Sequence, residues 1–311
     1  MNCSTNIIIN PYCHQGKGWA RWKLIRSSIK NMFPNAHSLI LEKGVSLPGF
    51  LDHLLVQGEH YLISAGGDGT VHHLINTLVK NHSDHLYNVR IGAIGLGSSN
   101  DFIKPVRSSS AGIPTRINAD RMIDHDIGKL EYLDEKGKDQ TEYFIINTSL
   151  GVTAFGNHMF NDPGQWLSFL KKHCTPMAII HTAVASLLLS RNYSCRMEFG
   201  NMIVEEELTN LNILKLPYVS GNFRYNQKID PNDGEMSINL CHGMGLFRKM
   251  RALYQLANGS LSAGKFMTSC KTDKLTIHTK EAVLFECDGE TFRSREIQIS
   301  VIPKAVKVVQ N

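Results

Sequence analysis

The chain lacks a hydrophobic run long enough to cross a bilayer, which takes about 20 residues. Its most apolar segment, residues 177–189, is interrupted by His181, Thr182 and Ser186. The first residues also lack the basic start and long apolar core of a signal peptide. We therefore expect no transmembrane segment and a cytoplasmic protein.

Cysteine patterning and strong charge are also missing. The seven cysteines are scattered without a C-x-x-C pair, so neither a disulfide framework nor a zinc site is indicated. The net charge of +5 is mild, and no long basic run or basic stretch with interleaved aromatics indicates nucleic acid as a partner. Basic clusters at 171–172 and 248–251 suit either an anionic membrane surface or ordinary solvated helices.

What the chain does have is length and a regular pattern. Its 311 residues, 42% of them hydrophobic, predict a soluble globular protein with two domains. The first 105 residues alternate strand and helix, which predicts a parallel sheet covered by helices. The expected elements are 6–10, 19–32, 37–41, 49–57, 61–65, 71–80 and 89–94. Residues 106–121 lose this pattern, and we place the domain boundary there or just beyond.

The rest of the chain is richer in strands. Residues 127–133 and 143–147 flank a polar turn at 134–137, which predicts a hairpin. Further strands are expected at 208–214, 235–241, 274–278, 283–287 and 296–302. Two helical patterns interrupt them, at 166–190 with a break at Pro176 and at 246–257.

A glycine-rich turn links the expected strand 61–65 to the helical pattern that begins at Val71. Such a turn directs unpaired N–H groups and the positive end of the helix dipole at one point, which suits a phosphate. An ordinary tight turn is the alternative, but three glycines and an acid within five residues favour phosphate binding. The residues are Gly66, Gly67, Asp68, Gly69 and Thr70.

Two more polar loops follow strands of the same expected sheet. One follows the strand that ends at Ile94, and the other begins at Asn10 and continues to residues 14–18. In open parallel sheets, ligands bind at the carboxyl ends of the strands, so the three loops predict one binding rim. The candidate residues on the added loops are Asn10, Gly97, Ser98, Asn100 and Asp101.

An acidic segment at 286–290 is the last candidate. If a strand continues to Glu290, then Glu286, Asp288 and Glu290 share one face, and Gly289 lets a substrate approach. A turn with solvated acids is the alternative.

Five segments resemble the soluble diacylglycerol kinase catalytic family in order and spacing: 66–70, 97–102, 126–128, 147–151 and 287–290. That family includes sphingosine and ceramide kinases and bacterial soluble lipid kinases. The similarity covers nearly the whole chain. NAD kinases and phosphofructokinases share the glycine-rich turn, whereas the G-S-S-N-D-F sequence at 97–102 favours lipid kinases.

The resemblance implies an α/β N-terminal domain with a parallel sheet, like that of NAD kinases and phosphofructokinases, and a C-terminal antiparallel β-sandwich. ATP and lipid would meet in the cleft between them. The expected segments are a nucleotide-binding domain at 1–124, a lipid-binding domain at 125–290, and a C-terminal segment at 291–311 that returns to the first domain.

The resemblance also implies residue roles. Asp288 would be the general base that accepts the proton of the lipid hydroxyl, with Glu290 in support. Residues 66–70 would hold the ATP phosphates, and the nucleotide and Mg²⁺ side would be lined by Ser98, Asn100, Asp101 and Asp126. The segment 230–235 looks like the family's structural magnesium loop, with ligands from Asp233, Asp230 and the carbonyl of Glu235.

One departure from the family stands beside the glycine-rich turn. His72 and His73 replace the usual Asn-Glu pair. Neighbours on a helix point in different directions, so they are not a zinc pair, and we expect one to pack and the other to face solvent or the cleft.

The sequence thus predicts a kinase that uses ATP and Mg²⁺ to phosphorylate a hydroxyl of diacylglycerol or a related lipid at a membrane surface. Peripheral attachment to the inner membrane face and a homodimer are left open, as is the identity of the lipid. The alternatives are a NAD kinase and a catalytically impaired nucleotide- or lipid-binding module, the latter suggested by the histidine pair.

Overall fold

The computed structural model describes residues 4–55, 58–200, 202–221 and 223–310. The chain divides into two compact units, residues 1–125 with 304–311 and residues 126–303. Two long strands have residues in both units, β7 (Met122–Leu133) and β17 (Glu290–Val309).

The first unit is built on a parallel sheet. Its strands are β1 (Ser4–Ile9), β2 (His37–Ile40), β3 (His60–Gly66) and β4 (Val89–Gly95). They pair in the order β2-β1-β3-β4, all parallel, and the end of β17 adds a parallel strand beside the start of β4. Almost every residue of β3 and β4 is buried, as expected for strands covered on both faces.

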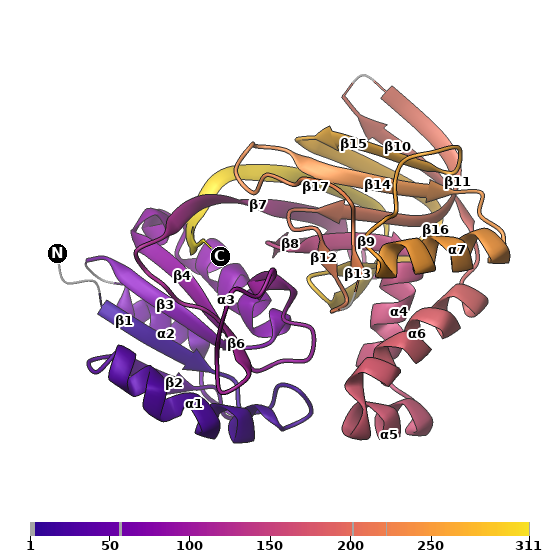
Figure 1. Cartoon of the computed structure of the whole chain (residues 1–311). Coiled ribbons are helices and arrows are strands. Elements are labelled where there is room, and N and C mark those ends of the chain that lie inside the picture. Colours follow the sequence, from indigo (N-terminus) through magenta and orange to yellow (C-terminus); the bar gives the residue numbers. More distant parts are fainter. Residues whose placement is uncertain (1–3, 56–57, 201, 222, 311) are drawn as a thin grey trace. The chain divides into compact units, whose positions relative to one another are not determined.

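Three helices cover this sheet (Figure 1): α1 (Gly18–Met32), α2 (Leu47–Leu54) and α3 (Asp68–Asn81). On α1, Trp22, Ile25 and Ile29 form an apolar stripe that packs against sheet residues such as Ile7 and Ile63. Short elements complete the unit: η1 (Ser83–Asn88), η2 (Asp101–Ile103), β5 (Ser108–Ser110) and β6 (Ile113–Arg116). The predicted α/β character of the first domain is confirmed.

The second unit is an antiparallel sheet. Its strands, besides β7 and β17, are β8 (Asp139–Phe144), β9 (Asn147–Gly151), β10 (Tyr193–Phe199), β11 (Met202–Leu214), β14 (Met236–His242), β15 (Met267–Thr272) and β16 (Lys274–Cys287). Both β9 and β10 lie between β11 and β16. One core contains Leu130 of β7, Leu240 of β14 and Phe285 of β16, so the sheet surrounds a shared interior. A β-rich second domain is confirmed, and its sandwich form stays a prediction.

Four helices and a small hairpin complete the second unit (Figure 1). They are α4 (Val152–Asn161), α5 (Gln165–His173), α6 (Thr175–Leu189), α7 (Leu246–Ala257) and the strands β12 (Tyr218–Val219) and β13 (Phe223–Arg224). The break expected at Pro176 falls at Cys174, because proline is accommodated in the first turn of α6. Among the described residues, no helix has the length and apolar character needed to span a bilayer.

The last strand differs from the expected layout. We expected the chain to leave the second domain after residue 290, but β17 pairs with β16 as far as Ser300. Residues 291–303 therefore belong to the second unit, and only the part from Lys304 onward belongs to the first. The passage between the units falls at Pro303 and Lys304, and the backbone of Lys304 has a positive φ of 50°.

Candidate functional site

The first group of candidate residues lies where the sheet order reverses. The chain moves from β1 outward to β2 and then returns to β3 on the other side of β1. Such a reversal leaves a crevice at the carboxyl ends of the two central strands, where open α/β sheets bind ligands. Asn10 follows β1, and Gly67 follows β3 and caps α3. The amide of Asn10 donates to the hydroxyl of Thr70 at 3.0 Å, which joins the two loops across this position.

The two glycine-rich loops touch through their backbones. The N–H groups of Leu96 and Gly97 both donate to the carbonyl of Gly66, at 2.8 and 3.1 Å. A Cβ atom on Gly97 would lie 2.4 Å from the Cα of Gly67, which is closer than two non-bonded carbon atoms can approach. Glycine at 97 is therefore required by this contact, and the loops form one continuous surface.

Asn100 holds the second loop in shape. Its backbone is left-handed, with φ of 51°, a conformation that asparagine tolerates better than most residues. Its side chain accepts from the N–H of Gly97 at 3.1 Å and donates to the carbonyl of the same residue at 3.0 Å. Asn100 is buried, whereas Ser98 at the tip of the loop is exposed. The structure thus makes Asn100 a clamp and leaves the Ser98 hydroxyl accessible.

Two carboxylates lie behind the loops. Asp68, in the first turn of α3, accepts from the N–H of Asp101 at 3.0 Å and from the N–H of Phe102 at 3.1 Å. Burial and the nearby charge of Asp101 raise the pKa of Asp68 to about 7. Asp101 accepts from the ammonium of Lys104 at 2.6 Å. A cation beside this pair would relieve the repulsion between the two carboxylates.

The two histidines after the turn behave as expected. His72 is buried and lies against Asn76, whose amide donates to the His72 carbonyl at 3.1 Å. His73 is exposed. One histidine packs and the other faces outward, which confirms the prediction.

The acidic segment in the second unit forms a turn. β16 ends at Cys287, which pairs with Glu290 at the start of β17. Between them Asp288 and Gly289 both have positive φ, 45° and 98°, as in the two-residue hairpin turn that Asp-Gly favours. The strand therefore does not continue to Glu290, and the three acids do not share one strand face.

The carboxylate of Asp288 points into a backbone cradle. It accepts from the N–H groups of Ile145, Ile146 and Asn147 at 2.9 to 3.0 Å. The N–H of Asp288 in turn donates to the carbonyl of Asn147 at 2.9 Å. Asp288 is only 4% exposed. The Asp288 carboxylate therefore holds the hairpin turn against the start of β9.

Glu286, not Glu290, is the acid packed beside Asp288. Glu286 is 1% exposed and accepts from the amide of Asn147 at 3.2 Å, from the N–H of Gly289 at 2.9 Å and from the hydroxyl of Ser149. Its burial, with the neighbouring charge of Asp288 acting in the same direction, raises the pKa of Glu286 to about 8. Glu290 is exposed. The polar run 147–149 on the partner strand is the sequence signal that could have identified Glu286.

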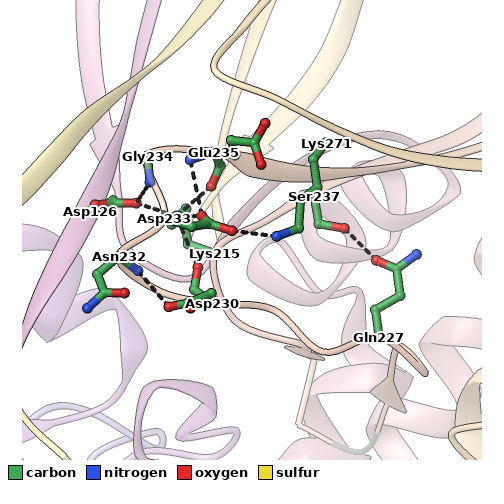
Figure 2. Close-up of polar contacts among 10 residues, drawn as sticks. All are labelled: Asp126, Lys215, Gln227, Asp230, Asn232, Asp233, Gly234, Glu235, Ser237 and Lys271. Atoms are coloured by element: carbon green, nitrogen blue, oxygen red, sulfur yellow. Dashed lines mark hydrogen bonds and ion pairs between the residues drawn. The ribbon is translucent and has the colours of Figure 1, made fainter.

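The remaining predicted residues gather in the second unit around a lysine that our sequence reasoning missed (Figure 2). Asp126 is fully buried and accepts from the ammonium of Lys215 and from the N–H of Gly234, both at 2.8 Å. The carboxylate of Asp233 accepts a hydrogen bond from the ammonium of Lys271. Among the described residues, no group of three or more His, Cys, Asp or Glu side chains could hold a metal.

The described cysteines form no disulfide in either unit. Six of the seven lie in the described part of the chain. Burial raises the pKa of Cys195 and Cys241 to about 12, so both are unreactive. Cys3 lies outside the described residues.

Residues 4–132, which include both glycine-rich loops, match the family model of the diacylglycerol kinase catalytic domain. This match spans most of the first unit and ends within β7. The resemblance read from the sequence motifs is confirmed.

Two relatives match nearly the whole chain. The chain is 22% identical over 305 residues to a protein of Staphylococcus carnosus named "Putative lipid kinase", covering 95% of this chain and 92% of that protein. It is 21% identical over 313 residues to "Putative lipid kinase YtlR" of Bacillus subtilis, covering 97% of each. A crystal structure described as a diacylglycerol kinase from Bacillus anthracis matches with a TM-score of 0.68 and 15% identity, covering 99% of this chain and 97% of that one. This last likeness concerns the fold.

Proposed function

We propose that the protein is a lipid kinase that transfers the γ-phosphate of ATP to a hydroxyl of diacylglycerol or a related lipid. The proposal rests chiefly on the two glycine-rich loops, which meet at the order reversal of the sheet within the residues that match the diacylglycerol kinase catalytic domain. The names of the two relatives favour a lipid as the acceptor.

The ATP side of the proposal uses backbone groups. Gly67, Asp68 and Gly69 lie at the N-terminus of α3, where N–H groups and the helix dipole favour phosphate. Thr70 is tied to Asn10 by its hydroxyl, and Asn100 fixes the facing loop at Gly97. These contacts keep both loops in place before the nucleotide arrives, so little ordering is needed on binding.

The paired carboxylates fit a magnesium ion bound with the nucleotide. Mg²⁺ in phosphotransferases is usually held by one or two carboxylates together with substrate phosphates and water. Asp68 and Asp101 supply such carboxylates, and a bound cation would favour the ionised form of Asp68, whose pKa is raised to about 7 by burial and by the charge of Asp101. When bound, Mg²⁺ would neutralise phosphate charge during transfer. We do not assign Asp126 to this ion, because Lys215 already holds its carboxylate.

On the acceptor side, we propose Asp288 as the general base, in agreement with the family resemblance. A base within reach of the attacking hydroxyl contributes about 10²- to 10⁴-fold to the rate. The three N–H groups hold the carboxylate of Asp288 in one orientation. Supporting roles for Glu290, and for Ser98 on the nucleotide side, stay predictions.

A lipid acceptor requires access to a membrane, and the helices of the second unit offer a suitable surface. α6 contacts both α5 and α7. These helices expose large apolar side chains, including Trp166, Phe169, Ile180, Leu188, Phe247 and Tyr254. Lys172, Arg248 and Arg251 lie among them and are also exposed. Apolar residues beside basic ones suit an anionic bilayer surface, so we propose peripheral membrane attachment through α5, α6 and α7.

Incubation with γ-labelled ATP, Mg²⁺ and vesicles that contain diacylglycerol, ceramide and sphingosine should transfer label to a lipid. Gly97→Ala should abolish this transfer and weaken ATP binding, because the new Cβ would push the two loops apart. Gly264→Ala is the matched control, since a Cβ there meets nothing within 4 Å and its backbone is not left-handed.

Two results would decide against the proposal. Conversion of NAD to NADP without lipid labelling would favour a NAD kinase. ATP binding without turnover on any lipid would favour a catalytically impaired binding module.

A further inference from the structure

The ammonium of Lys215 lies at the centre of the loop that resembles a magnesium site (Figure 2). It donates to the carbonyl of Glu235 at 2.5 Å and to the carboxylate of Asp126 at 2.8 Å. The carbonyl of Asp230 is 3.5 Å away and the carboxylate of Asp233 is 3.7 Å away. We call these four oxygen donors the cation cage. Lys215 and Asp126 are both fully buried within it.

Three of the four cage residues are those that the family resemblance assigns to a magnesium ion. Asp230, Asp233 and the carbonyl of Glu235 were the expected magnesium ligands, and all three face the same nitrogen. Mg²⁺ needs oxygen ligands at 2.0 to 2.1 Å in an octahedral arrangement. The ammonium of Lys215 already donates to the carboxylate of Asp126 and to the carbonyl of Glu235. A metal bound to these oxygens would therefore occupy the same space beside a like charge. The residues present therefore do not fit a divalent ion.

We propose that Lys215 supplies the permanent cation of this loop, so that residues 230–235 adopt their fold without a metal. The inference does not rest on the kinase reaction, because it concerns the charge balance of the cage alone.

Charge balance explains why a cation is needed here. A buried carboxylate such as Asp126 is costly unless it is paired and hydrogen-bonded. Its other contacts close the loop onto β7, because the N–H of Gly234 donates to the carboxylate and the N–H of Asp126 donates to the carbonyl of Pro231 at 2.7 Å. Lys271 adds a second ion pair to Asp233 from the surface, where it is 44% exposed.

The position of Lys215 also ties the cage to the Asp288 cradle. The N–H groups of Lys215 and Leu216 donate to the carbonyl of Ile146 at 2.9 and 3.0 Å. The N–H of the same Ile146 donates to the carboxylate of Asp288 at 2.9 Å. Ile146 thus links Lys215, the residue after β11, to the candidate base.

Thermal unfolding of the full chain tests the proposal without any activity measurement. The midpoint is measured in EDTA, in MgCl₂ and in CaCl₂, each without nucleotide, for the wild type and for Lys215→Ala, Lys215→Met and Lys271→Ala. We expect any metal effect on the wild type to persist in Asp233→Asn, because it arises outside the cage. Lys271→Ala should shift the midpoint by a few degrees at most, since exposed ion pairs contribute little.

The two Lys215 variants differ in whether they leave space for a metal. Both should lower the midpoint in EDTA by roughly 10 °C, because Asp126 loses its partner. Lys215→Ala opens the cage, so Mg²⁺ or Ca²⁺ should restore about 5 °C or more at saturation. Lys215→Met fills the space without a charge, so no metal should restore its stability.

Three outcomes would overturn the proposal. The first is a wild-type midpoint that rises with metal and loses this rise in Asp233→Asn. The second is a Lys215→Met variant as stable as the wild type. The third is a Lys215→Ala variant that neither metal stabilises, which would make the lysine an ordinary buried ion-pair partner. The wild-type and Asp233→Asn comparison keeps the test decisive even if both Lys215 variants fail to fold.

Discussion

The raised pKa of Glu286 makes a quantitative prediction about stability. The pKa rises from 4.5 to about 8 on folding, so between these values the folded chain binds a proton that the unfolded chain has released. Stability must therefore fall as pH rises through this window, because the native state holds more protons than the unfolded state. The full effect is at most about 5 kcal/mol, and the part between pH 6 and pH 8 is about 2 kcal/mol.

The Glu286→Gln variant removes this dependence. Glutamine resembles the protonated acid in shape and charge, and its oxygen can still accept from Asn147 and Gly289. Between pH 6 and pH 8 the wild type should lose about 2 kcal/mol more than the variant, or roughly 4–8 °C in midpoint. Taking the difference cancels the titration of all other groups, including Asp68.

Calorimetry or urea unfolding at several pH values provides the measurement. Glu290→Gln is the matched control, because it makes the same substitution four positions later at an exposed side chain. Its pH profile should follow the wild type. If Glu286→Gln showed the wild-type slope between pH 6 and pH 8, the reasoning about a buried neutral acid would be refuted.

Three further predictions follow from the same geometry. ATP·Mg²⁺ should bind up to about tenfold more weakly at pH 6 than at pH 8. The reason is that Asp68, whose pKa is raised to about 7, must lose its proton before it can bind a cation. Equal affinities at the two pH values in titration calorimetry would contradict this. Asp288→Asn should slow lipid phosphorylation by about 10²- to 10⁴-fold and also lower the unfolding midpoint, because an amide nitrogen would replace one of the two carboxylate oxygens and face an N–H donor of the cradle; an intact rate would exclude Asp288 as the base. Phe247→Ser should weaken binding to anionic vesicles in a flotation assay without changing stability, since Phe247 is 92% exposed. Tyr87→Ser is the control, because Tyr87 lies on the first unit and is 72% exposed. An equal loss of vesicle binding in both variants would argue against a specific surface on α7.

The first unit was predictable because its signals are local. Apolar runs of strand length alternate with helical periodicity, and all seven elements expected in residues 6–94 are present within about three residues of their predicted ends. Its loops were predictable for the same reason, since glycines at strand ends have few other uses than close approach or positive φ. The role of Asn100 could not be predicted from the sequence. A side-chain amide that faces a ligand and one that hydrogen-bonds within its own loop look the same there.

The second unit depends on pairings between distant segments, which a single sequence does not reveal. We expected separate strands at 274–278 and 283–287, but they form one strand, β16, with an irregularity between His278 and Val283. Lys215 follows an apolar strand and has no local sign of its role; its partners come from residues up to 89 positions away. The sequence grouped Asp230, Asp233 and Glu235 as magnesium ligands, whereas the structure places the ammonium of Lys215 beside them.

The central claim is that this chain moves phosphate from ATP to a lipid, and one measurement tests it directly. Purified protein is incubated with ATP carrying ¹⁸O in its γ-phosphate, Mg²⁺ and a total lipid extract, and the lipids are analysed by mass spectrometry. The account predicts that a hydroxyl lipid, diacylglycerol or a relative, gains a heavy phosphate with wild-type protein and with Gly264→Ala but not with Gly97→Ala. A lipid extract that gains no heavy phosphate, while the same protein preparation binds ATP, would contradict it.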